Sequence, residues 1–150
     1  MWCYILNITI SVPDALPSRV GKTYDRSRDI VLKAPGLFAV CSGNGDIDAR
    51  QNARQGVYFH DTRFVRRLAL TINGVAMLAE GADIGQGRRC RFHLVNRPLH
   101  LQGRLVPRGT IRIARVRTLA TDIRETLLVQ NCGPDTLSVD VGIRISARFE

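Results

Sequence analysis

The sequence predicts an all-β fold, an antiparallel sandwich built from short strands. After Ile30, short apolar runs are broken by turn residues about every ten positions, a spacing typical of sandwiches and barrels. No segment keeps apolar residues at the i, i+3, i+4, i+7 spacing of a helix over three turns. We expect strands at Leu37–Cys41, Gly56–Phe59, Phe64–Ile72, Val75–Ala79, Leu99–Val106, Thr110–Leu119, Ile123–Gln130 and Leu137–Phe149.

The last predicted strand has the clearest alternation. Apolar side chains occupy the odd positions of Leu137–Phe149, and polar or small residues occupy the even ones. Because successive side chains of a strand point to opposite faces, one face is expected to pack and the other to contact water.

Two turns are expected to set the topology. Asn73–Gly74 is the strongest short hairpin signal and joins the two predicted strands on either side of it. Residues 131–136 contain Gly133 and Pro134, which suit a turn. They predict a hairpin that folds Ile123–Gln130 back onto the final strand.

Two charged residues interrupt the apolar phase of their strands. Arg66 shares its phase with Leu68 and Leu70, and Glu125 shares its phase with Leu127. An unpaired charge that faces a core costs several kcal/mol. We therefore expect Arg66 and Glu125 to pair with each other, or each to reach water at the rim.

The chain is expected to hold one folded domain. Its 150 residues are enough to bury roughly 68–70% of the surface of the unfolded chain. Residues 1–29 are predicted to be an N-terminal arm without clear periodicity, and residues 30–150 the sandwich domain. No window approaches the roughly 18 uninterrupted apolar residues of a membrane-spanning helix.

Composition narrows the function classes. Lysine and arginine total 22 against 13 acidic residues, for a net charge of +9, and only Lys22 and Lys33 are lysines. The arginines are scattered in runs no longer than two, whereas nucleic-acid-binding surfaces have clustered basic residues. The distribution therefore argues against nucleic-acid binding. The four cysteines form no C-x-x-C pair, so we expect reduced thiols and a cytoplasmic location.

Motifs for metal or catalysis are sparse. Cys90 and His93 offer two zinc-type ligands, but a structural zinc site needs four, so no metal or other cofactor is expected. The loop at 43–48 is glycine-rich but opens no helix, so a turn between strands explains it better than a ligand-binding loop does. The histidines His60, His93 and His100 and the glutamates Glu80, Glu125 and Glu150 form no recognisable catalytic set.

The segment 56–74 is the most distinctive part of the sequence. Asp61 and Thr62 are turn formers, and Arg63 can brace the corner through bidentate bonds. An aromatic-rich stretch precedes Asp61-Thr62-Arg63, and a leucine-alternating strand follows and closes on Asn73–Gly74. Together with Gly36–Ile47 before it and Arg124–Asn131 after it, this segment resembles the N-terminal domain of bacterial and archaeal glycogen-debranching-like enzymes, the amylo-α-1,6-glucosidase group.

The resemblance implies an antiparallel sandwich that precedes an (α/α)6 barrel, and in that family the barrel carries the catalytic carboxylates. The chain ends at Glu150 with no such barrel, so the resemblance implies a truncated, non-catalytic accessory domain. Its closing sandwich strands are then expected to be missing at the C-terminal end, which would leave an exposed edge or an apolar face. Its expected partners are an (α/α)6 glycosidase domain or subunit and an α-glucan. Candidate sugar-contacting residues lie at the corner: Tyr58, Phe59, His60, Asp61 and Arg63.

Two other interpretations stay open. One is a basic β module that binds single-stranded nucleic acid, with charge from Arg112, Arg115 and Arg117 but no rings beside them for base stacking. The other is a non-functional fragment of a split gene.

Overall fold

The computed structural model describes residues 6–11 and 28–148, and the regular structure within them is entirely β. The predicted fold class is therefore confirmed. Within the same residues, no helix is long and apolar enough to cross a membrane.

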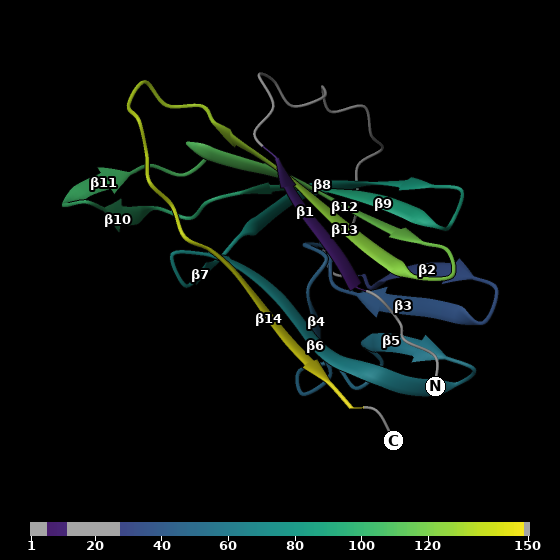
Figure 1. Cartoon of the computed structure of the whole chain (residues 1–150). Helices are drawn as coiled ribbons and strands as arrows, with labels where there is room; N and C mark the ends of the chain where they lie inside the picture. The colour runs from purple at the N-terminus through teal and green to yellow at the C-terminus, as the bar shows by residue number, and fades with distance from the viewer. Residues whose placement is uncertain (1–5, 12–27, 149–150) are drawn as a thin grey trace.

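One sheet has five strands in the order β1, β13, β12, β9, β8 (Figure 1). They are β1 (Leu6–Ser11), β13 (Ile123–Asn131), β12 (Ile111–Leu119), β9 (Arg89–Val95) and β8 (Leu78–Gly85). Strand β1 pairs in parallel with β13, and the other neighbours are antiparallel. The predicted N-terminal arm thus contributes an edge strand that the sequence did not indicate.

The second sheet has the order β14, β6, β5, β3, β2. These strands are β14 (Val141–Ala147), β6 (Thr62–Ile72), β5 (Gly56–Phe59), β3 (Leu37–Cys41) and β2 (Ile30–Ala34). Two short strands, β4 (Ile47–Asp48) and β7 (Val75–Ala76), also pair with β6. A separate hairpin is formed by β10 (Leu99–Leu101) and β11 (Arg104–Val106).

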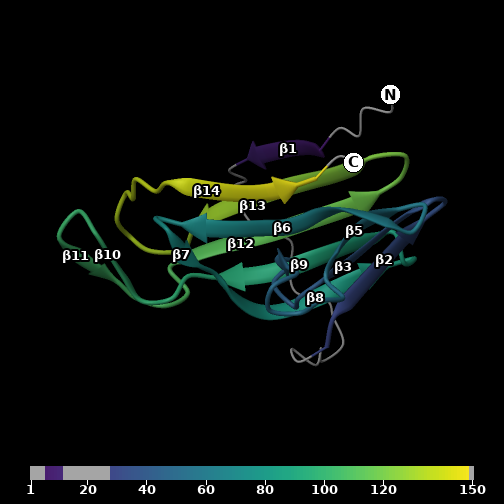
Figure 2. The ribbon, with the colours of Figure 1, turned by 90° about the horizontal axis from the view of Figure 1, so that it is seen from below.

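The two sheets face each other and bury the apolar core between them (Figure 2). On one side, the backbone of Lys33 in β2 donates to Gly87 O in the β8–β9 turn at 2.8 Å and so joins the sheets. On the other side lie the edge strands β1 and β14. Large core side chains come from both sheets: Leu32, Ile47, Leu68, Ile72, Phe92, Ile113 and Leu127.

Most predicted strands exist, and two have the predicted bounds, namely β3 and β5. The hairpin at Asn73–Gly74 is confirmed, because both residues adopt the left-handed backbone (φ 48° and 77°) and β7 pairs with β6. Leu99–Val106 is not one strand but two, because Gln102 and Gly103 form a turn of the same kind (φ 51° and 75°). Strands β2 and β9 were not expected.

The hairpin expected at residues 131–136 is wrong. Strand β13 already has β12 on one edge and β1 on the other, so no edge is free for the final strand. The chain instead crosses to the other sheet, where β14 pairs with β6. The crossing ends at the β6–β7 turn, where Asn73 and Asp140 exchange two hydrogen bonds, Asn73 N to Asp140 O and Asp140 N to Asn73 Oδ1.

The alternation of the last strand produces only a partly buried face. Val141 and Ile143 pack against the core, but Ile145 keeps 44% of its surface exposed. Strand β14 is the last strand of its sheet, so no other strand in the described residues pairs with its outer edge.

Arg66 does not face the core, because β6 is irregular at this position. Val65 lies opposite Ala147 and Arg67 lies opposite Ser146, which leaves Arg66 as an extra, bulged residue. A bulge reverses the inside–outside phase of a strand. Val65 and Leu68 are therefore both buried, and Arg66 is exposed to solvent.

Candidate functional site

The corner between β5 and β6 is a tight two-residue turn. His60 and Asp61 occupy it with positive φ angles of 42° and 66°, and Phe59 pairs with Thr62 across it. Aspartate tolerates the left-handed region better than most residues. The corner is a turn, as the sequence predicts, but His60 and Asp61 form it, both exposed, and Thr62 is already the first residue of β6.

Three side chains form a row across neighbouring strands beside this corner. Tyr58 of β5 stacks on Phe38 of β3, with ring centroids 4.5 Å apart and planes 5° apart. On the β6 side, the Arg63 guanidinium carbon lies 5.9 Å from the centre of the Tyr58 ring. Because β5 lies between β3 and β6, the two faces of the Tyr58 ring are flanked by protein.

Arg63 braces a loop rather than the Asp-Thr corner. Its Nη1 donates to Ala53 O at 2.7 Å, and Tyr58 Oη donates to Arg54 O at 2.9 Å. The Arg63 stem passes so close to Gly56 that a Cβ there would lie 2.5 Å from Arg63 Cδ. This position of β5 therefore requires glycine.

A shallow pocket of about 360 Å³ lies between this corner and the hairpin of β2 and β3. It is lined by Lys33, Phe38, His60 and Asp61 together with Ala34, Gly36 and Leu37. An aromatic ring flanked by a cation, a carboxylate and an imidazole can contact the apolar and hydroxyl groups of a sugar. Of the residues expected to contact sugar, His60 and Asp61 line this pocket, whereas Tyr58, Phe59 and Arg63 do not. Tyr58 stacks on Phe38, and Arg63 lies beside Tyr58.

A charged cluster lies inside the sandwich. Glu125 of β13 is 3% exposed and accepts from Arg115 Nε at 2.7 Å and from Arg117 Nε. Arg115 and Arg117 of β12 are 2% and 0% exposed. Arg115 Nη1 also donates to Asp46 Oδ1 at 2.7 Å, so two buried cations face two carboxylates, the buried Glu125 and the partly exposed Asp46.

Glu125 therefore does not pair with Arg66, contrary to expectation. The same cluster corrects the view of Arg115 and Arg117 as a basic surface for nucleic acid, because both point inward. The sequence did carry a signal for them. Both arginines share the odd phase of Ile111, Ile113 and Leu119 on β12, and Glu125 lies directly opposite Arg117 in the pairing of β12 with β13.

The cluster fixes the protonation state of Glu125. Burial alone would raise the pKa of this carboxyl, but the Arg115 and Arg117 guanidinium groups outweigh that effect and hold it below its ordinary 4.5. Burial likewise disfavours the charged form of Arg115, but Glu125 and Asp46 raise its pKa above the ordinary value. Glu125 stays ionised at neutral pH, so it cannot serve as a general acid.

The cluster also anchors the glycine-rich loop at 43–48. Arg117 Nη2 donates to Gly45 O at 2.7 Å, and Leu70 N donates to Asp46 Oδ1 at 3.0 Å. Gly45 has a φ of +83°, and a Cβ there would lie 3.0 Å from the Phe92 ring. The loop is a turn between strands, as the sequence suggests, and the buried charges hold it in place.

Cys90 and His93 do not meet. Three residues apart on β9, they point to opposite faces: Cys90 is fully buried, and His93 contacts Asp83 with 2.7 Å between Nε2 and Oδ2. Burial raises the pKa of the Cys90 thiol to about 12, which disfavours the thiolate that binds metal. Within residues 6–11 and 28–148, no three His, Cys, Asp or Glu side chains are placed to hold a metal ion.

Fold and site together define an antiparallel β-sandwich domain whose buried charges are paired with one another. The family comparison places it further: a model of the N-terminal domain of some glycogen debranching enzymes matches residues 32–150. The chain belongs to this family, as the resemblance in its sequence predicts. No curated protein matches the chain.

Proposed function

We propose that this chain is an accessory domain that packs against an (α/α)6 glycosidase domain and assists it in α-glucan metabolism. Membership in the family of debranching-enzyme N-terminal domains carries this proposal. Glycoside hydrolysis ordinarily uses one carboxyl that can donate a proton and a second that acts as base or nucleophile. Glu125 and Asp46 are committed to arginines, which supports a role in shape and binding rather than bond cleavage.

The edge strands β1 and β14 are the proposed packing surface. They lie on the same side of the sandwich, and each carries an exposed isoleucine, Ile10 at 50% and Ile145 at 44%. Free strand edges with exposed apolar side chains are characteristic of surfaces that another protein element covers.

A size-exclusion experiment tests the packing. The chain is mixed with the (α/α)6 domain of a debranching enzyme from this family. We expect co-elution that Ile145→Glu abolishes and that Ile84→Glu leaves intact. Ile84 is 52% exposed on β8, which is the edge of the five-stranded sheet opposite to β1. Loss of co-elution in both variants, or in neither, contradicts packing through β14.

The corner pocket is the proposed glucan contact, with Phe38 as the apolar platform and His60 and Asp61 as polar neighbours. Migration in gels that contain glycogen tests it. His60→Gly with Asp61→Gly removes both side chains yet keeps the positive φ angles that glycine tolerates. We expect this variant to lose the retardation by glycogen.

Gln102→Gly is the matched control, because Gln102 occupies the same kind of turn (φ 51°) in the β10–β11 hairpin. It is expected to migrate like the unchanged chain. If the unchanged chain is not retarded by glycogen, the glucan contact is refuted and only the packing role is left.

We further assign the domain to the cytoplasm. Cys41 and Cys90 are both buried as free thiols, which suits a reducing compartment.

A further inference from the structure

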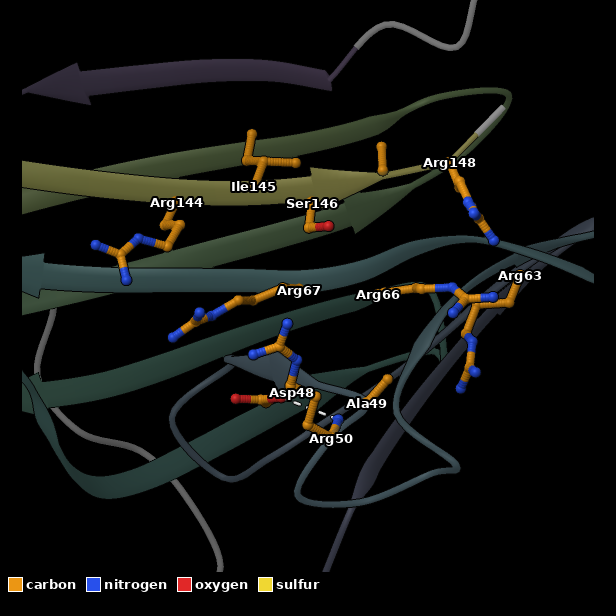
Figure 3. Close-up of a pocket in the computed structure, with 11 residues that line it drawn as sticks. Asp48, Ala49, Arg50, Arg63, Arg66, Arg67, Arg144, Ile145, Ser146 and Arg148 are labelled. Carbon is orange, nitrogen blue, oxygen red and sulfur yellow. Dashed lines mark hydrogen bonds between the residues drawn. The ribbon is translucent and has the colours of Figure 1, made fainter. Parts of the chain in front are cut away.

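A second cleft, on the outer face of the sheet that contains β6, is lined by arginines. It has a volume of about 630 Å³ and lies between β6, β14 and the loop after β4 (Figure 3). Six of its eleven lining residues are arginines, and Asp48 is the one carboxylate among them. The arginines come from all three segments: Arg50, Arg63, Arg66, Arg67, Arg144 and Arg148.

The bulge in β6 creates this concentration of charge. In a regular strand, Arg66 and Arg67 would point to opposite faces. Because Arg66 is the extra residue opposite β14, both side chains line the cleft. Arg144 of β14 and Arg148, the residue after β14, also line the cleft. In Figure 3, Arg63, Arg66 and Arg148 lie toward one end of the cleft, and Arg50, Arg67 and Arg144 lie toward the other.

Six arginines against one carboxylate, Asp48, leave the cleft with an excess of positive charge. Among the residues that the structure describes, Arg50, Arg66, Arg67 and Arg144 form no ion pair. Arg67 Nε is also buried, and no described residue accepts a hydrogen bond from it. In the core, by contrast, the protein supplies Glu125 and Asp46 as ion-pair partners for its two buried arginines, although Arg117 Nη1 is without an acceptor there as well.

The chemistry of the lining selects the ligand. Guanidinium groups bind phosphate oxygens through paired, charge-assisted hydrogen bonds. The volume lies within the range of small-molecule sites. No aromatic ring lines the cleft, so it lacks the stacking platforms with which proteins hold single-stranded nucleic acid. We propose that this arginine cleft binds a small ligand that carries phosphate groups, a function separate from the glucan contact.

Calorimetric titration of the full chain with tripolyphosphate tests the proposal. We expect saturable binding with one ligand per chain. Arg66 and Arg144 are both exposed, so Arg66→Ala with Arg144→Ala is expected to weaken binding roughly tenfold or more through lost charge-assisted hydrogen bonds without loss of folding.

The control is Arg88→Ala with Arg108→Ala, two exposed arginines outside the cleft. It removes the same net charge and is expected to leave the affinity within about twofold, since additive effects of distant surface charges are small. Equal weakening in both double variants means that overall charge, not the cleft, attracts the ligand, and overturns the proposal. So does the absence of saturable binding.

Further titrations identify the source of the phosphate. Tighter binding of glucose 6-phosphate than of inorganic phosphate supports a phosphorylated sugar, and equal affinity supports free phosphate. If a single-stranded oligonucleotide binds more tightly than tripolyphosphate and loses affinity in the cleft variant, the surface serves nucleic acid and the proposal is wrong. Glycogen retardation of the cleft variant is expected to be unchanged, which separates this test from that of the corner pocket.

Discussion

Replacing Glu125 by glutamine tests the role of the buried charge cluster. Glutamine has nearly the same shape as glutamate, so packing is preserved while the charge is removed. Arg115 and Arg117 are then left in the core with the carboxylate of Asp46 alone. Breaking a buried pair by removing one partner typically costs about 3–5 kcal/mol, against a typical domain stability of about 5–15 kcal/mol.

Urea denaturation followed by far-UV circular dichroism measures this loss. The control is Asp135→Asn, because Asp135 and Arg104 form a surface pair 3.7 Å apart with side chains 65% and 73% exposed. Exposed pairs contribute about 0–1 kcal/mol, so the control is expected to unfold close to the unchanged chain. A Glu125→Gln variant as stable as the Asp135→Asn variant would refute the structural role of the cluster.

Three further predictions concern pH, glycine and thiols. The pKa of Glu125 is lower in the folded state than in the unfolded state, so its stabilising contribution is complete above the unfolded-state pKa near 4.5 and is lost as the pH falls below it. Acid denaturation of the unchanged chain is expected to show this loss of stability, whereas the Glu125→Gln variant is expected not to show it. In urea denaturation, Gly45→Ala is expected to lower the free energy of unfolding by about 2–4 kcal/mol and Gly74→Ala by about 1 kcal/mol. Both glycines have positive φ, but only at Gly45 would the new Cβ contact a buried ring. In a Cys3→Ser background, a disulfide reagent such as Ellman's reagent is expected to modify exposed Cys132 at once and buried Cys90 only on unfolding; rapid labelling of both would contradict the burial of Cys90.

The local patterns in the sequence predict much of this fold because they depend on neighbouring residues alone. Alternation and the turn at Asn73–Gly74 specify strands and a hairpin without reference to the rest of the chain. The pairing of β14 with β6 could not be predicted in this way. It depends on which strand edges are already occupied, and β1, which takes the free edge of β13, has no clear signal in the sequence.

In the candidate site, too, local features can be predicted from the sequence, whereas contacts between distant residues cannot. The Asp61-Thr62 corner and the irregular positions of Arg66 and Glu125 are visible in the sequence, but their partners are not. Arg66 leaves the core through a bulge that only the register with β14 reveals. Glu125 finds its partners on the neighbouring strand β12, where Arg115 and Arg117 share the inward phase.

Glucose release from an α-1,6-branched oligosaccharide tests the central claim most directly. The purified chain is assayed alone and after addition of the (α/α)6 domain of a family member. We predict no release by the chain alone, and a higher rate from the mixture than from the (α/α)6 domain by itself. Steady release by the purified chain, or a mixture no faster than the (α/α)6 domain, would contradict an accessory role.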